Sequence, residues 1–187
     1  MRWTWIAAMY VAAIATAPSA ERVPIRLGDP LERFDRLKAG TRTYLRYSIS
    51  ADGVPEAIDI QTKEVRFEEH DGRRLVRIVQ RWDGPKGSLR LDSLAEAGTL
   101  RPLTHQRDLH KDGAVRREGF RFHPDRIVGI DDQPDNVRKD FAIASPVPAF
   151  NFEIDLETFA ALPLRMGAGF EIPFYHPGGG APTPYLF

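Results

Sequence analysis

Four Asp-Gly pairs punctuate a long stretch of alternating apolar and polar residues, and this pattern constrains the fold more than any other feature of the sequence. The alternation runs from residue 41 to about residue 130. The pairs within it are Asp52-Gly53, Asp71-Gly72, Asp83-Gly84 and Asp112-Gly113. Period-two alternation is typical of half-buried β-strands, and Asp-Gly favours tight hairpin turns because both residues tolerate positive φ. The sequence therefore predicts a mainly β fold, a curved, meandering antiparallel sheet.

Taken as two-residue turns, three of these pairs fix which side chains face each other across the hairpins. The predicted partners are Arg46 with Asp59, Leu45 with Ile60 and Tyr47 with Ile58; Val65 with Ile78, Phe67 with Val76 and Glu69 with Arg74; and Leu103 with Phe122, His105 with Phe120, Arg107 with Glu118 and Asp108 with Arg117. In the strand shared by the first two hairpins, apolar residues switch from even to odd numbers. This switch predicts a β-bulge near Lys63 or Glu64.

The pattern changes after residue 130, where prolines accumulate and long irregular loops are expected. One short helix is predicted over residues 155–162, capped by Asp155 and stopped by Pro163. A strand over residues 170–175 precedes a turn at His176 and the glycines that follow it. The chain ends on an apolar trio, residues 185–187, which resembles the beginning of another strand. We therefore expect the domain to continue beyond Phe187.

The first 20 residues have the layout of a secretory signal peptide. Arg2 precedes an apolar run over residues 3–15, and small residues follow up to Ala20. The run is shorter than the roughly 20 residues that a membrane-spanning helix needs. The predicted organisation is a cleaved signal peptide at 1–20, a lead-in segment at 21–40 and a single β-rich domain at 41–187. The mature protein is expected in the periplasm or outside the cell, with no stable membrane span.

Composition excludes several classes of function. The 26 basic and 26 acidic residues give no net charge, so no nucleic-acid partner is expected. With 42% hydrophobic residues the chain can build a folded core. The sequence contains no cysteine, which excludes disulfides, thiolate metal sites, cysteine nucleophiles and lipid attachment through an N-terminal cysteine.

The order of segments in the second half resembles a known family. The stretch FNFEIDLETFAALPLRMGAGFEIPFYHPGG follows a hairpin that contains LRPLTHQRDLHKDG. This arrangement is similar to uncharacterised exported bacterial proteins of the domain of unknown function 3108 type. The resemblance implies a strongly curved antiparallel half-barrel, similar to periplasmic lipoprotein carriers, with strands continuing beyond Phe187. It brings no established catalytic residues.

Histidines and acids on the third hairpin suggest a metal site, but strand geometry argues against it. On a strand His105 faces one way while Asp108 and His110 face the other, and His123 lies near the far end from His110. Asp108 is also predicted to pair with Arg117. A metal-assisted hydrolase that uses His105, His110, His123 or His176 remains an alternative function.

Other candidate sites have simpler structural explanations. The acids Asp131, Asp132 and Asp135, beside Asn136, lack the spacing of a calcium loop. No Lys-Ser/Thr pair follows the glycines Gly178, Gly179 and Gly180, so a flexible turn is expected. Ser88, Ser93 and Ser145 lie outside any nucleophile elbow. Glu153, Asp155 and Glu157 flank a helix start, where negative charges interact favourably with the helix dipole. No catalytic residue, metal or cofactor is predicted.

Aromatic residues remain as candidates for binding. A curved sheet covered by only one short helix can leave an apolar concavity that accepts lipophilic ligands. The residues predicted to line it are Tyr47, Phe67, Trp82, Phe120, Phe122 and Phe159. Six more aromatics, Tyr44, Phe150, Phe152, Phe170, Phe174 and Tyr175, are expected mainly in the core. The leading hypothesis is a non-catalytic envelope protein that binds a lipid, another hydrophobic ligand or a protein partner. A structural subunit of an envelope assembly is the other alternative.

Overall fold

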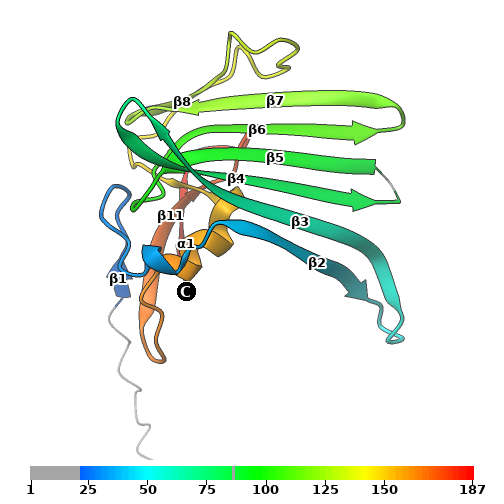
Figure 1. Ribbon diagram of the computed structural model, residues 1–187, viewed down its shortest axis with the longest axis horizontal. Helices are drawn as coiled ribbons and strands as arrows, with labels where there is room; N and C mark the ends of the chain where they lie inside the picture. The colour runs from blue at the N-terminus through cyan, green and yellow to red at the C-terminus, as the bar shows by residue number, and fades with distance from the viewer. Residues whose placement is uncertain (1–21, 86) are drawn as a thin grey trace, which may run out of the picture.

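A computed structural model describes residues 22–85 and 87–187 and contains an eight-stranded antiparallel sheet. The strands follow one another in sequence order across this sheet, and the sheet curves without closing on itself (Figure 1). They are β2 (Gly40–Ile49), β3 (Pro55–His70), β4 (Arg73–Gly84), β5 (Gly87–Glu96), β6 (Pro102–Lys111), β7 (Ala114–Phe122), β8 (Arg126–Gly129) and β9 (Ala142–Ala144). The predicted mainly β class is confirmed.

A smaller sheet and one helix pack against one end of the large sheet (Figure 1). Its central strand is β11 (Gly169–Tyr175), which pairs in parallel with β1 (Arg22–Pro24) and β10 (Phe150–Asn151). The last strand, β12 (Thr183–Leu186), runs antiparallel to β11. The helix is α1 (Asp155–Ala161), and the 3-10 turns η1 (Phe34–Arg36) and η2 (Phe152–Ile154) complete the layer.

The second and third hairpins have the predicted register. Val65 faces Ile78, and His105 faces Phe120. Both turns are the expected Asp-Gly type, with φ of 50° and 72° at Asp71 and Gly72 and of 51° and 77° at Asp112 and Gly113. Because both residues have positive φ, the turn follows the right-handed twist of the strands.

The first hairpin departs from the prediction at its turn. Ser50 donates its backbone N–H to the carbonyl of Val54, so the loop has three residues rather than two. This loop shifts the pairing by one residue, and a bulge between Arg46 and Ser48 restores it. Arg46 therefore faces Asp59 as predicted, whereas Tyr47 falls in the bulge and does not pair with Ile58.

The bulge predicted near Lys63 or Glu64 is wrong. β3 pairs without interruption with both neighbours across this region. The apolar phase switches because the environment changes along the strand: Val65 faces the core, whereas Ile58 and Ile60 lie on the opposite face and are each 50% exposed. The change in numbering of the apolar residues therefore came from apolar residues on the exposed face and not from a bulge in β3.

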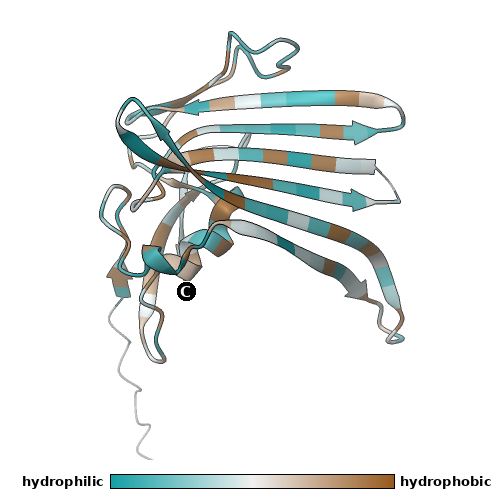
Figure 2. Cartoon of the chain, viewed as in Figure 1, coloured by the Kyte–Doolittle hydropathy of each residue, from teal (hydrophilic) through white to brown (hydrophobic). Residues whose placement is uncertain are grey.

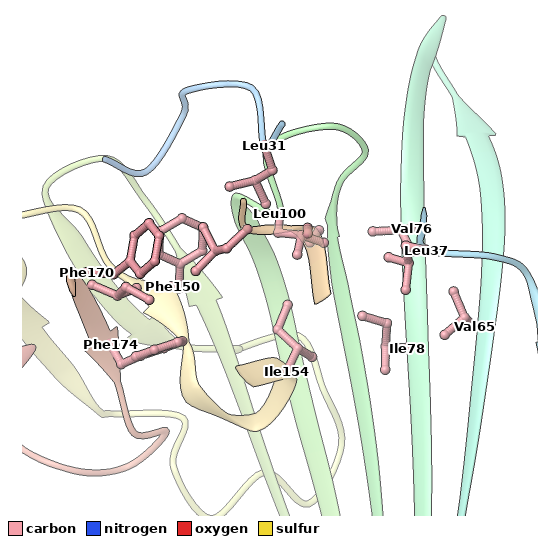
Figure 3. Close-up of a cluster of buried hydrophobic side chains, with 14 residues drawn as sticks. Leu31, Leu37, Val65, Val76, Ile78, Leu100, Phe150, Ile154, Phe170 and Phe174 are labelled. Atoms are coloured by element: carbon pink, nitrogen blue, oxygen red, sulfur yellow. The ribbon is translucent and has the colours of Figure 1, made fainter. Parts of the chain in front are cut away.

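The main core lies between β3, β4 and β5 on one side and β11, η1 and α1 on the other (Figure 3). Val65 and Ile78 from the large sheet meet Ile154 and Phe174 from the covering layer, and all four are fully buried. Leu31 and Leu37, from the predicted lead-in segment, also lie in this core. A second cluster comprises Phe120, Ile127, Ala149 and Tyr175.

The helix and the last strands lie close to their predicted positions. α1 ends one residue earlier than expected, and Asn151 rather than Asp155 caps this region, by accepting from the backbone N–H of Glu153 at the start of η2. The predicted signal peptide lies outside the described residues. Within the described ranges, no helix has the length and apolar character to cross a membrane.

The loop over residues 130–141 covers the free edge of β7. Asn136 donates to and accepts from the backbone of Gly119 at 3.0 Å, and Val137 donates to the carbonyl of Arg117. A Cβ at Gly129 would come within 1.8 Å of the Arg138 carbonyl, which explains why glycine stands there. The loop therefore satisfies backbone groups that β8 is too short to reach.

Candidate functional site

The face of the large sheet that packs against α1 and β11, here called the inner face, is only half covered. The strands extend well past α1 and β11 towards their hairpin turns (Figure 1). Hydropathy alternates along β3 to β7 as far as these turns (Figure 2). The sheet thus has a covered end, which holds the core, and an open end.

Two neighbouring rows of paired residues cross the inner face at the boundary between these ends. The open row consists of Tyr44, Gln61, Trp82, Leu89, Leu109 and Arg116, on β2 to β7 in order. The polar row, two residues nearer the core on each strand, consists of Arg42, Lys63, Gln80, Leu91, Arg107 and Glu118.

The open row is largely apolar and accessible. Tyr44 and Leu109 are each 41% exposed, and Trp82 and Leu89 are half-buried. The guanidinium of Arg46 lies 4.5 Å from the centre of the Trp82 ring, and it is held by Asp59 at 2.8 Å. A pocket of about 230 Å³ lies here, lined by Trp82, Leu89 and Leu109 among others. Of the six aromatics predicted to line an apolar concavity, Trp82 is the one that lines this pocket.

The polar row is tied to the covering layer. Lys63 Nζ lies 3.1 Å from the carboxylate of Glu157 on α1, and both side chains are almost fully buried. Gln80 donates to the carbonyl of Glu153, and Gln61 donates to Gln80 at 2.9 Å. A buried ion pair needs both members, because either charge alone would be left without water or a partner. These contacts determine how far α1 and η2 extend over the inner face of the sheet.

Three guanidinium groups converge on the single carboxylate of Glu118. Arg107, Arg116 and Arg138 all donate to it, the last two at 2.9 and 3.2 Å. Burial by itself would raise the pKa of Glu118, but the hydrogen bond and charge of Arg107, with Arg138 and Arg116, lower it. Arg116 is 57% exposed and Arg138 36% exposed, so the cluster reaches solvent.

A glycine turn lies over the same arginines. A Cβ added to Gly178 would lie 3.3 Å from a terminal nitrogen of Arg107 and 3.7 Å from one of Arg138. The backbone N–H of Gly178 donates to the Tyr175 hydroxyl at 3.0 Å, and burial raises the pKa of Tyr175. The predicted glycine turn therefore forms a wall of the arginine cluster, where a larger residue would crowd the guanidinium groups.

A buried serine and histidine lie in contact beneath this region. Ser93 Oγ lies 2.9 Å from His105 Nδ1, and Asn151 donates to Ser93 Oγ at 3.3 Å. All three side chains are at most 2% exposed. Burial, helped by the charge of Arg107, lowers the pKa of His105 to about 3. The three side chains therefore form a buried hydrogen-bonded group within the core.

The remaining histidines do not converge. Asp108 and His110 lie on the opposite face from His105, as predicted, and Arg117 donates to Asp108 at 3.0 Å. His176 bonds to the Tyr185 hydroxyl at 2.5 Å, and His123 lines a separate pocket. In the part of the chain that the structure describes, no three His, Asp or Glu side chains group as metal ligands.

The other polar candidates are also dispersed. Asp131, Asp132 and Asp135 are exposed on the loop that Asn136 anchors. Ser145 donates to the Val147 carbonyl, and Ser88 lies in the outward-facing row with His110. Glu157 is the exception among the predicted helix-start acids, because it pairs with Lys63 instead of facing solvent.

The six predicted ligand-lining aromatics do not form one group. Trp82 lies in the open row. Tyr47 is half exposed at the bulge of β2, and Phe67 packs edge-to-face on Phe34 in the main core. Phe120 and Phe122 belong to the second cluster, and Phe159 on α1 packs against Phe174 and Phe187.

Sequence reasoning missed the residues that frame the open row. Arg107 and Glu118 were predicted to pair, but their place on the inner face was not recognised. The available signal was phase: both share the odd or even numbering of the buried residues His105 and Phe120. Arg138 comes from a loop, where no periodicity locates it. Leu89 and Leu109 were not recognised as members of an apolar row, because polar and charged residues flank both in the sequence.

A larger pocket, of about 520 Å³, lies away from the large sheet. It is bordered by β1, β11 and the loop before β10, and five of its lining residues are prolines. Arg26 and Glu171 supply its charges. Its lining includes no residue of the arginine cluster or of the open row. The open end of the inner face is therefore the stronger candidate site.

Comparison with known proteins identifies a family. A family model described as Protein of unknown function (DUF3108) matches residues 46–185. Neither the curated proteins nor the solved structures contain a significant match to this chain. The family model spans β3 to β11 entirely, together with parts of β2 and β12, and so includes the open row from Gln61 to Arg116. The chain therefore belongs to the DUF3108 family.

Proposed function

We propose that this protein is an exported, non-catalytic envelope protein that binds a lipophilic ligand on the open end of its inner face. One observation carries the proposal: Leu89, Leu109 and Trp82 form an apolar strip that α1 and β11 leave uncovered. Exposed apolar surface at a concave site is a common mark of ligand binding. The buried state of Ser93 and His105 argues against these residues as catalysts.

The first test is native mass spectrometry of the protein recovered from the periplasm, before and after mild organic extraction. A bound mass that extraction removes supports the proposal. Metal content is measured on the same sample, since a stoichiometric metal would instead favour the hydrolase alternative. The mass of the protein also reports whether the first 20 residues are removed. An empty, metal-free protein would contradict ligand binding.

A role as a subunit of an envelope assembly has its own support in strand β2. All ten residues of β2 are exposed, and in the described ranges β2 pairs on one side only, with β3. A long free edge can accept a strand from another chain. Photo-crosslinking in cells from position Thr43 tests this role. Crosslinks to one envelope protein that Leu45→Lys abolishes would favour it over ligand carriage.

A further inference from the structure

We infer that the ligand of the open end is a single-tailed amphiphile with an anionic head, bound by Arg116, Arg138 and Arg107. This inference rests on the proposed function and adds the chemical class of the ligand. The open row itself ends on Arg116, directly beside Leu109. The apolar strip and the arginine cluster are therefore parts of one continuous surface.

The arginine cluster has more charge and more donors than its own acid uses. Glu118 offers two oxygens, whereas three guanidinium groups carry fifteen N–H donors between them. Glu153, which is half-buried near Arg107 and Lys63, adds a second negative charge, and Lys63 is balanced by Glu157. Around Glu118 itself, three guanidinium groups contact one carboxylate, which leaves a net positive charge at this point of the surface. Because Arg116 and Arg138 reach solvent, this charge is available to a ligand.

The donor geometry suits a carboxylate or a phosphate. Guanidinium groups bind such heads through paired, charge-assisted hydrogen bonds. Gly178 lies directly over Arg107 and Arg138, so the glycine turn closes one side of the cluster without a side chain of its own. Gly179 and Gly180 in the same turn are exposed. An anionic head arriving from solvent therefore meets the exposed guanidinium groups of Arg116 and Arg138 first.

The width of the apolar strip limits the tail. Towards the core the strip is bordered by the polar row, whose one apolar member, Leu91, is buried. Towards the hairpin turns it is bordered by Arg46 and Asp59 on β2 and β3 and by Gly84 and Gly87, which have no side chains, on β4 and β5. The strip is thus one side chain wide. Paired strands are about 4.8 Å apart, so the row from Arg116 to Tyr44 is about 24 Å long. A narrow, extended surface fits one alkyl chain better than two.

The test compares three ligands that share one tail: laurate, dodecyl phosphate and dodecanol, all below their micellar concentrations. Of the three tryptophans, Trp3 and Trp5 lie in the predicted signal peptide, so Trp82 is the one tryptophan of the mature protein. Its emission reports occupancy of the open row. Titration calorimetry on the same samples gives a Kd that does not depend on Trp82.

The double variant Arg116→Gln/Arg138→Gln removes two guanidinium groups from the cluster, while Arg107 still pairs with Glu118. The matched control is Arg81→Gln, which removes an arginine that is 65% exposed on the opposite face. We expect laurate and dodecyl phosphate to bind more tightly than dodecanol. The double variant should weaken the two anions by about tenfold or more and leave dodecanol unchanged. The control should bind all three like the wild type.

Each other outcome has a distinct meaning. Equal binding of the three ligands, or an unchanged anion affinity in the double variant, would overturn the anionic head and leave the lipophilic site standing. Failure of all three to bind would overturn the proposed function, and this inference with it. Equal urea midpoints for the wild type and variants establish that any loss of binding is not a loss of folding.

Discussion

The covered and open ends of the large sheet are built from the same strands and the same alternation, yet they have opposite surfaces. On β4, Ile78 is fully buried beneath the covering layer, while Trp82, four residues further along the same face, borders a pocket. On β6, His105 is fully buried and Leu109 is 41% exposed. Alternation therefore determines which face a side chain occupies, but elements distant in sequence determine whether that face is covered.

The largest expected effect concerns the ion pair at the boundary between the two ends. Glu157→Leu leaves the buried ammonium of Lys63 without a partner and should destabilise the protein by about 3–5 kcal/mol. The double variant Lys63→Met/Glu157→Leu should recover most of this loss, because no buried charge remains. Urea denaturation measures both. A single variant as stable as the double would mean that water reaches Lys63.

Matched truncations at the two ends should differ in the free energy of unfolding, by less than the loss expected from breaking the ion pair. Ile78→Ala creates a cavity in the main core and should cost about 2–5 kcal/mol. Leu109→Ala removes a side chain that already contacts solvent and should cost less than about 1 kcal/mol. The two midpoints in urea give the comparison directly. Similar losses in both variants would show that the open end is covered in solution.

Stability should fall as the pH falls below about 6.5, in part because of His105. Its pKa is lowered to about 3 in the folded state, so below pH 6.5 the unfolded chain binds a proton that the folded chain does not. This one group should cost about 1.4 kcal/mol for each further pH unit, down to about pH 3. His105→Gln should flatten the curve over this window. Parallel curves for both proteins would contradict the assignment.

The smallest effects are expected on the outer face, where charges are already paired in water. Arg77 bonds Glu68 and Asp92, each at 2.8 Å, so Arg77→Gln should cost up to about 1 kcal/mol. Arg81 lies 3.8 Å from Asp83 and is more exposed, so Arg81→Gln should change stability by less than about 0.5 kcal/mol. Thermal unfolding in low and high salt tests both. An effect of Arg77→Gln that survives high salt would mean a packing role.

Local signals explain how much of the fold was predictable. Asp-Gly turns and charge pairs such as Asp108 with Arg117 act over a few residues, and the hairpin registers followed from them. The parallel pairing of β1 and β10 with β11 joins segments far apart in the chain, and strands of two or three residues carry no periodic signal. The bulge at Arg46 was missed because the three-residue loop and the bulge compensate each other.

The candidate site was predictable only in outline. Trp82, one of the six aromatics proposed for ligand binding, lines a pocket together with Leu89 and Leu109. Of the other five aromatics, Phe67, Phe120, Phe122 and Phe159 pack in hydrophobic clusters, because large rings bury more area there. Arg138 approaches Glu118 from a loop 20 residues away, and only the folded chain brings the two together.

The loop that Asn136 anchors also makes the two edges of the large sheet unequal. At one side the backbone of β7 is satisfied by this loop, and the outermost strand β9 has only three residues. At the other side, among the residues that the structure describes, the ten residues of β2 pair with β3 alone. The β2 edge is therefore the longer of the two edges to which another strand could be added. Two copies that met through β2 would form a closed pair with twofold symmetry, and growth into a fibre would stop there.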